Sequence, residues 1–218
     1  MESTREKTTA EQQTNCKNCG APLDKFGNWE YWEVRKGGQL GMDKIKMEKN
    51  TAGDSRVSKG IPTMEDFDHA NNSHRKDVYC LVKRFCDLLE VNAMKHDWTK
   101  VEEPYRTMFY DDMCATIRGE RDFFDGEWSR LHYYELERHH LKRHCPDDVN
   151  LLDVIEMVCD CVSAGMARSG QVYDLDIDEK ILSKALTNTV ELLKNQIEVV
   201  EHEDSPLKQA IEKNKLAE

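Results

Sequence analysis

The sequence predicts an all-α domain, because three observations favour helices over strands from about residue 72 onward. Apolar residues recur there at spacings of three and four along several segments. Helix-capping residues precede most of these segments, and proline or glycine follows several of them. No convincing run of alternating strand residues occurs in this region. We therefore expect a helical domain over residues 72–202, built as a bundle of five to six helices.

The first two helices are expected on either side of residue 96. Ser73 can cap a helix through DVYCLVKRFCDLLEVNAM, and its apolar positions at core spacing are Val78, Leu81, Val82, Phe85 and Leu88. Thr99-x-x-Glu102, with Pro104 in the first turn, is typical of the start of a second helix through MFYDDMCATI.

Three further helices are expected between residues 126 and 200. The segment GEWSRLHYYELERHHLKRH forms the third, which Cys145-Pro146 stops. The segment NLLDVIEMVCDCVSAGMA is the fourth and is apolar nearly all round, as in a buried helix. Asp176-x-x-Glu179 starts the fifth, whose apolar face extends to Ile197. This long amphipathic helix, residues 179–200, is also a candidate interface for a homo-oligomer.

The rest of the chain is expected to be less regular. Residues 1–14 are polar and predicted to be disordered, and residues 37–71 form a polar, flexible connector. Residues 203–218 form a tail or a short helix after Pro206. The apolar runs are too short for a membrane span, and the N-terminus lacks a secretory signal, so we expect a cytoplasmic protein that does not contact membranes.

Residues 15–36 resemble a metal knuckle that has lost half of its ligands. The segment begins Cys16-x-x-Cys19-Gly, the thiolate pair of a zinc ribbon, but Trp29-x-x-Trp32 stands where a second pair would be. Two thiolates cannot complete the four-coordinate site of a structural zinc. We therefore do not expect zinc here in a monomer, although Cys80, a second chain or a disulfide could complete the pairing. The preferred interpretation is a degenerate zinc-ribbon-like loop in which apolar burial replaces the metal, through Trp29, Tyr31 and Trp32.

The net charge of the chain limits the kinds of molecule that it can bind. The formal net charge is −11, which argues against general nucleic-acid binding because phosphate neutralisation needs a basic surface. A small anionic substrate held by a few local cations remains compatible with this charge. The eight cysteines are expected to be thiols or metal ligands, as is usual in a reducing compartment.

Histidines concentrate between residues 96 and 144. His96-Asp97 supplies an imidazole and a carboxylate, a mixed set suited to a divalent metal. For the dipeptide alone, a helix-terminal histidine followed by a turn aspartate is the favoured interpretation. His140 and His144 would lie one turn apart on the third helix, a usual spacing for two ligands of one metal. A solvated basic helix end is the alternative for this segment.

Carboxylates form a stripe along the otherwise apolar fourth helix. Asp153, Glu156 and Asp160 follow one another at spacings of three and four. Buried carboxylates cost several kcal/mol unless they are paired or bound to a metal. The stripe therefore predicts either a metal centre or pairing with Lys or Arg of a neighbouring helix, and the sequence does not choose between them.

The order of these motifs resembles the HD superfamily of metal-dependent phosphohydrolases. In that superfamily a first His, an HD pair and a later Asp hold the metal, and the matching residues are His74, His96, Asp97 and Asp160. The strings HDWTK, HHLKRHCP and NLLDVIEMVCD also resemble an uncharacterised HD-like family of bacteria and phages, over roughly residues 72–200. Cys145 and Cys161 depart from that family's pattern, which has His and Trp there. Cys145 is still a candidate ligand, but the change puts a second metal in doubt.

This resemblance implies an HD-like fold and a hydrolytic site. A divalent ion (Mn, Mg, Fe, Co or Zn) would activate water for attack on a phosphomonoester, such as a nucleotide or another small phosphorylated substrate. Lys100 would contact the phosphate, His139 or His140 would protonate the leaving group, and Glu156 would orient water or a ligand. His144 is a further candidate ligand. The rival expectation is a non-catalytic binding or scaffold protein with the same fold, including nucleotide binding without turnover. A phage-encoded member would act in the host cytoplasm.

Overall fold

The computed structural model describes residues 14–15, 22–23, 43–49 and 60–201. The chain divides into two units, residues 1–42 and residues 43–218. The described part of the first unit is an antiparallel pair of two-residue strands, β1 (Thr14–Asn15) and β2 (Pro22–Leu23). The knuckle cysteines and tryptophans, the expected disorder before residue 14 and the expected helix after Pro206 lie outside the described residues.

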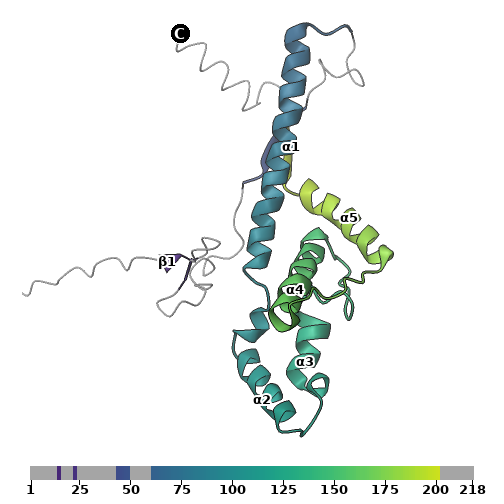
Figure 1. Ribbon diagram of the computed structural model, residues 1–218. Helices are drawn as coiled ribbons and strands as arrows, with labels where there is room; N and C mark the ends of the chain where they lie inside the picture. The colour runs from purple at the N-terminus through teal and green to yellow at the C-terminus, as the bar shows by residue number, and fades with distance from the viewer. Residues whose placement is uncertain (1–13, 16–21, 24–42, 50–59, 202–218) are drawn as a thin grey trace, which may run out of the picture. The chain divides into compact units, whose positions relative to one another are not determined.

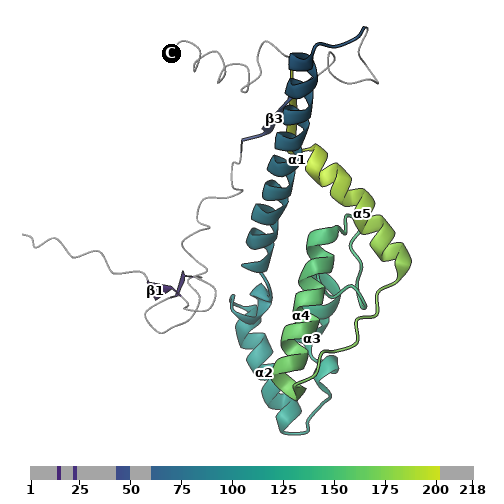
Figure 2. The ribbon, with the colours of Figure 1, turned by 45° about the horizontal axis from the view of Figure 1, so that its top comes forward.

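The second unit is mostly helical, as expected (Figure 1). The long helix α1 (Met64–Ala93) packs against α4 (Leu151–Ser169), which in turn packs against α5 (Glu179–Lys194). The helices α2 (Tyr105–Ile117) and α3 (Glu127–Leu131) pack against each other. Figure 2 shows α4 between α1 and α5, with α2 and α3 together at one end of the unit. Three single turns complete the unit: η2 (Trp98–Lys100), η3 (Phe123–Asp125) and the π-helical turn η4 (His132–Leu136).

The capping residue of helix α1 lies ten residues before the predicted capping residue Ser73. Thr63 caps it instead, because its hydroxyl accepts a hydrogen bond from Asp66 N at 3.1 Å while the Asp66 carboxylate accepts one from Thr63 N at 3.0 Å. Ser73 is a buried residue in the helix interior. Residues 64–71, expected in the flexible connector, are therefore helical.

A short parallel sheet covers part of α1, which the sequence did not predict. β3 (Ile45–Glu48) pairs with β4 (Ile197–Val200) over four residues, and β3 contacts α1. The expected fifth helix therefore ends at Lys194, and Ile197 lies in a strand. Arg84 of α1 joins the segments that lead into both strands, because it donates hydrogen bonds to Gln196 Oε1 at 2.9 Å and to Asp43 O at 2.8 Å.

The second expected helix also begins later, at Tyr105 with Pro104 as its capping residue, and Thr99 lies in the η2 turn instead. The third expected helix, residues 126–144, is broken. Regular α-helix ends at Leu131, the π-helical turn ends at Leu136, and residues 137–150 form a loop with short turns.

Arg138 ties this loop to the start of α4, because it donates two hydrogen bonds, of 2.8 and 2.9 Å, to the Asp153 carboxylate. Leu141 and Val149 of the loop are buried in the core with residues of α4 and α5. Tertiary packing of the loop therefore replaces the helix.

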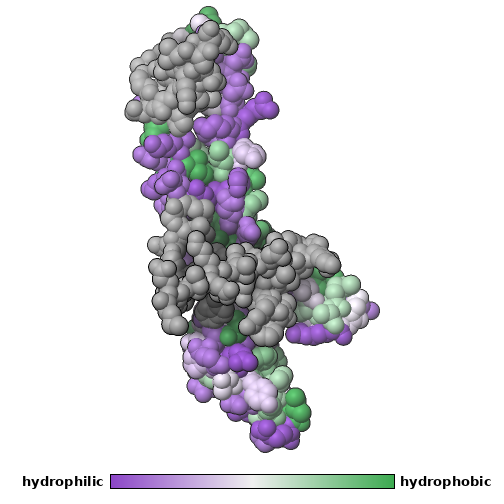
Figure 3. All heavy atoms as spheres, turned by 90° about the vertical axis from the view of Figure 1, so that its left-hand side faces the viewer, coloured by the Kyte–Doolittle hydropathy of each residue, from purple (hydrophilic) through white to green (hydrophobic). Residues whose placement is uncertain are grey.

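Two apolar centres hold the helices in place. One is formed by Leu141, Val149, Val154, Met157 and Ala185. The other surrounds the fully buried Trp128 of α3, whose ring packs on Phe109 and His132 and whose Nε1 donates to Thr99 O at 3.0 Å. On the face drawn in Figure 3, hydrophilic residues are interspersed with apolar ones. None of the described helices is both long and apolar enough to cross a bilayer.

Candidate metal centre

The chain turns sharply between α1 and η2, and this turn presents His96 and Asp97. Asp97 has a φ of 54°, and it is the sole residue other than glycine with positive φ in the described ranges. Aspartate tolerates this left-handed conformation better than most residues, and such backbone strain is concentrated at functional sites. The turn places the Asp97 side chain among histidines from η4 and the loop that follows it.

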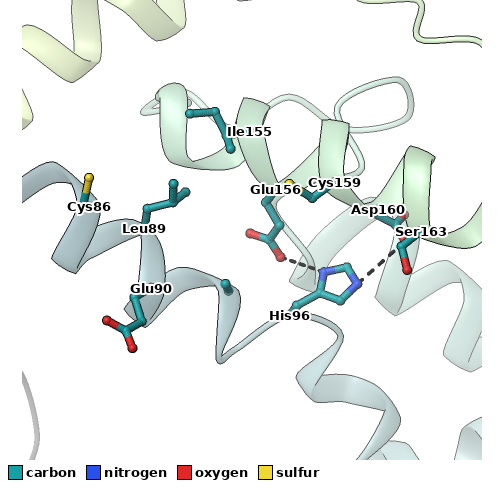
Figure 4. Close-up of a pocket in the computed structure, with 10 residues that line it drawn as sticks. Cys86, Leu89, Glu90, His96, Ile155, Glu156, Cys159, Asp160 and Ser163 are labelled. Atoms are coloured by element: carbon teal, nitrogen blue, oxygen red, sulfur yellow. Dashed lines mark hydrogen bonds and ion pairs between the residues drawn. The ribbon is translucent and has the colours of Figure 1, made fainter. Parts of the chain in front are cut away.

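Asp97 lies at the middle of a cluster of imidazoles. Its carboxylate oxygens lie 3.3 Å from His96 Nε2, 3.4 Å from His132 Nε2 and 3.7 Å from His139 Nε2. His140 Nε2 lies 2.8 Å from His132 Nε2. Asp160 of α4 completes the cluster, with its Oδ1 3.7 Å from His96 Nε2 (Figure 4). Four segments that are separate in sequence therefore converge.

Three overlapping sets of these side chains could each hold a metal ion. The sets are His96, Asp97 and His139; Asp97, His132 and His140; and His139, His140 and Asp160, each with donor atoms within 4.8 Å of one another. Imidazole nitrogens and carboxylate oxygens are a donor set that suits Zn, Mn, Fe or Co. Because the sets share residues, the cluster could hold one ion, or two ions that share Asp97.

Two buried atoms support a metal more directly than proximity does. Asp97 Oδ1 and His139 Nε2 are buried and have no hydrogen-bond partner within the described part of the chain. A buried polar atom without a partner costs about 1–3 kcal/mol. Both atoms face each other across 3.7 Å, and an ion bound by both would satisfy them.

Glu156 of α4 orients two of the histidines. Its Oε1 lies 3.0 Å from His96 Nδ1 and 3.1 Å from His139 Nδ1. When Nδ1 carries the proton and faces a carboxylate, Nε2 presents its lone pair on the other side of the ring. Glu156 therefore favours the tautomer in which both Nε2 atoms can bind a metal next to Asp97.

Thr99 and Glu137 orient a third histidine. Thr99 donates to Glu137 Oε1 from its backbone N at 3.0 Å and from its hydroxyl at 2.9 Å. The hydroxyl oxygen, whose single proton goes to Glu137, accepts a hydrogen bond from His132 Nδ1 at 2.7 Å. The Nε2 lone pair of His132 is then directed at the Asp97 and His140 side chains.

The protonation states of His132, His140 and Asp97 agree with this arrangement, whereas His96 must lose a proton before its Nε2 can coordinate. Burial lowers the pKa of His132 to about 3, and the charge of Asp97 opposes this effect only in part. Burial, together with the charges of His139 and His132, lowers the pKa of His140 to about 2. Both rings are therefore neutral near pH 7 and able to coordinate. Burial acts against ionisation of Asp97, but hydrogen bonds and charge from His96 and Lys100 hold its pKa well below the usual range. Burial likewise disfavours the charged form of His96, yet Asp97 and Glu156 raise its pKa to about 10.

Two of the expected ligands are not part of the cluster. His74 is exposed on α1, about 28 Å along the helix axis from the end of α1 at a rise of ~1.5 Å per residue. His144 is exposed in the loop after η4, because the helix expected to place it one turn from His140 is absent. Both predictions were wrong. Cys145, the other candidate ligand, packs against the hydrophobic core instead.

The other predicted residues do come together. His96, Asp97 and Asp160 converge, Lys100 Nζ contacts the Asp97 carboxylate, and Glu156, His139 and His140 are close by. Within the carboxylate stripe of α4, Asp153 pairs with Arg138, whereas Glu156 and Asp160 face histidines. Pairing with a cation of a neighbouring segment therefore holds for Asp153, whereas Glu156 and Asp160 belong to the candidate metal centre.

Sequence reasoning missed three buried residues of the site, His132, Thr99 and Glu137. Thr99 was expected to begin a helix, and Glu137 to lie within one. His132 has a local signal: it follows Trp128 by four residues, and these two rings stack with centroids 4.2 Å apart.

Two cavities adjoin the cluster. The larger, of about 500 Å³, lies between α1 and α4 and is bordered by His96, Glu156 and Asp160 (Figure 4). The smaller, of about 230 Å³, is bordered by His139, His140 and Asp160. Asp160 belongs to both, so the cluster is open to small molecules from two sides.

The fold and the site together define an all-α protein with a His/Asp cluster that could hold a divalent metal ion. The chain belongs to a family of unknown function (DUF5662), whose model matches residues 63–214. No curated protein and no solved structure matches the chain.

Proposed function

We propose that the protein is a metal-dependent phosphohydrolase that acts on a small phosphomonoester, such as a nucleotide or another phosphorylated metabolite. The observation that carries the proposal is the convergence of four imidazoles and two carboxylates around Asp97 Oδ1 and His139 Nε2, two buried atoms that lack partners within the described residues. A divalent ion bound there would supply Lewis acidity and lower the pKa of a bound water.

The surrounding residues suggest a division of roles. His132 and His140, neutral at pH 7, serve as ligands, as does His139, which is only 1% exposed. The low pKa of His140 makes it a poor proton donor, so the geometry favours coordination over the general-acid role predicted from the sequence. Lys100 is partly exposed beside Asp97, and its ammonium group can balance the charge of a phosphate.

Two features favour a phosphate ester as the substrate: the cations near the cluster and the resemblance to HD phosphohydrolases. Lys142 and Arg143 border the smaller cavity, and Lys100 contacts the cluster itself, so cations lie close to the proposed ion. The HDWTK segment resembles HD phosphohydrolases, whose HD pair binds metal. The present cluster differs from that pattern, because His74 does not contribute and His132, His139 and His140 surround Asp97 instead.

One observation favours a non-catalytic alternative. The Nε2 atoms of His132 and His140 lie 2.8 Å apart, so these two rings can satisfy each other by a hydrogen bond without an ion. The cluster would then be a buried polar network in a binding or scaffold protein. This alternative predicts that the purified protein binds no divalent metal at this cluster.

Metal analysis combined with a substrate screen tests the proposal. Purified protein is expected to bind Mn²⁺ or Zn²⁺ at one or two ions per chain and to hydrolyse at least one of a panel of nucleoside monophosphates and aryl phosphates. Asp97→Asn should abolish both properties, whereas His74→Ala and His144→Ala should keep them. The proposal is overturned if the protein binds no divalent ion, or if Asp97→Asn retains the wild-type rate.

A further inference from the structure

The larger cavity beside the metal centre has mostly apolar walls. Its side chains come from one face of α1 and one face of α4, and include Cys86, Leu89 and Ala93 together with Ile155, Cys159 and Ser163. Its volume of about 500 Å³ is within the range of small-ligand sites. Figure 4 shows Leu89 and Ile155 on the side of the cavity away from His96, and Cys159 and Ser163 along α4.

This cavity is continuous with the metal centre. His96 forms part of its edge, and its ring lies between Glu156 and Asp160, with which it interacts at 3.0 and 3.7 Å (Figure 4). A molecule bound to an ion held by His96, Asp97 and His139 could therefore extend directly into the cavity.

The charge of the walls restricts what can occupy the cavity. Besides His96 and two cysteines, its titratable residues are the carboxylates Glu90, Glu156 and Asp160, and its described lining contains no lysine or arginine. A second phosphate would be repelled there. The lining also contains no Phe, Tyr or Trp ring that could hold a quaternary ammonium group by cation–π contact. Ser163 carries the sole hydroxyl group in the described lining.

The smaller cavity has the opposite character. Lys142 and Arg143 border it together with Tyr133 and Tyr173. The Arg143 guanidinium lies 4.4 Å from the ring centroid of Phe124, and its Nη1 donates to Tyr134 Oη at 2.8 Å, which holds the cation in place. The two sides of Asp160 therefore differ: one carries two cations and two tyrosines beside Asp174, and the other is mostly apolar and has no cation besides His96 in its described lining.

From this asymmetry we infer that the apolar cavity between α1 and α4 binds the organic part of the substrate, and that this part is an uncharged aryl or short alkyl group. The inference rests on the proposed function, because it takes the phosphate to bind at the metal centre. It narrows the substrate class from phosphomonoesters in general to esters whose alcohol is apolar.

Binding of two phosphonates to the manganese-loaded full chain tests this inference without requiring turnover. Methylphosphonate and phenylphosphonate carry the same anionic group, but phenylphosphonate alone can fill the apolar cavity. Isothermal titration calorimetry should give an affinity about tenfold to a hundredfold higher for phenylphosphonate, as expected for burial of one aromatic ring.

The variant Cys159→Phe places an aromatic ring in the cavity and provides the matched comparison. It should bind methylphosphonate like the wild type, which shows that its fold and metal centre are intact, and should lose the preference for phenylphosphonate. Cys159 and Cys86 are both exposed cysteines on the cavity, so phenylphosphonate should also slow their alkylation, whereas Cys114 on α2 should react unchanged.

The outcomes separate the inference from the proposed function. Equal affinity for both phosphonates, or an unchanged preference in Cys159→Phe, overturns the inference and leaves a phosphate-binding metal centre in place. Absence of binding by either phosphonate to the metal-loaded chain overturns the proposed function, and the inference falls with it.

Discussion

Replacement of Glu156 by glutamine should weaken metal binding without removing any proposed ligand. The Glu156 carboxylate accepts hydrogen bonds from His96 Nδ1 at 3.0 Å and from Asn92 Nδ2, and its Oε1 also lies 3.1 Å from His139 Nδ1. A glutamine amide has one oxygen that accepts, and its nitrogen donates instead. At least one of the two imidazoles then loses the partner that directs its Nε2 lone pair toward Asp97.

The size of the effect follows from the lost interaction. A hydrogen bond to a charged group contributes about 1.5–3 kcal/mol. Since ~1.4 kcal/mol corresponds to a tenfold change in an equilibrium constant, loss of one such bond predicts an affinity about tenfold to a hundredfold lower. This agrees with the usual effect of removing a residue that orients a metal ligand.

Competition titration with a fluorescent chelator measures this change for Mn²⁺ and Zn²⁺. The control is Glu90→Gln, which removes the same charge from α1 beside the same cavity but makes no contact with the histidines. Wild-type affinity in Glu156→Gln, or an equal loss in Glu90→Gln, would refute the orienting role of Glu156.

Four other predictions follow from named residues. Because the pKa of His96 is raised to about 10, its ring is protonated at neutral pH, and metal binding should release a proton. The logarithm of the apparent metal affinity should then rise with pH at a slope of ~1 per proton released. An affinity that does not change between pH 6 and 9 contradicts this prediction. Gly165→Ala should lower the free energy of unfolding by ~1–3 kcal/mol in urea titrations, since its Cβ would lie 2.4 Å from Gln171 O; an unchanged midpoint argues against this contact. Thr63→Ala should lower the free energy of unfolding by about 1 kcal/mol in the same assay, because it removes the cap of α1. Thr63→Ser should keep the cap and the wild-type stability. His74→Ala should leave metal affinity unchanged, and a loss would place this residue in the centre after all.

Local sequence patterns anticipated much of the helical framework. The capping residues and apolar spacing of α4 and α5 are properties of short segments, and their N-terminal bounds agree closely with the structure. The start of α1 was missed because Asn71, Asn72 and Ser73 have low helix propensity, whereas the packing of α1 against β3 continues the helix through them. The strand β4 was missed because its partner β3 lies about 150 residues away in sequence.

In the candidate site too, the sequence indicated the types of residue but not all of the positions that lie close together. The His96-Asp97 pair, Asp160 and the concentration of histidines indicate metal chemistry from residue type and order alone. The predictions for His74 and His144 failed because each assumed proximity to the cluster. Motif order along the chain was the basis for His74, and helical spacing was the basis for His144. A continuous helix carries His74 away from the cluster, and the break after Leu136 turns His144 outward.

The sequence by itself determined that the chain is helical and that imidazoles and carboxylates accumulate in one region, because these depend on composition and on spacing within a segment. The tertiary structure alone decided which of these side chains meet. The π-helical turn, the positive φ of Asp97 and the Arg138–Asp153 pair bring His132, His139 and His140 around one carboxylate. That convergence depends on long-range packing, which a pattern of residues along the chain does not encode locally.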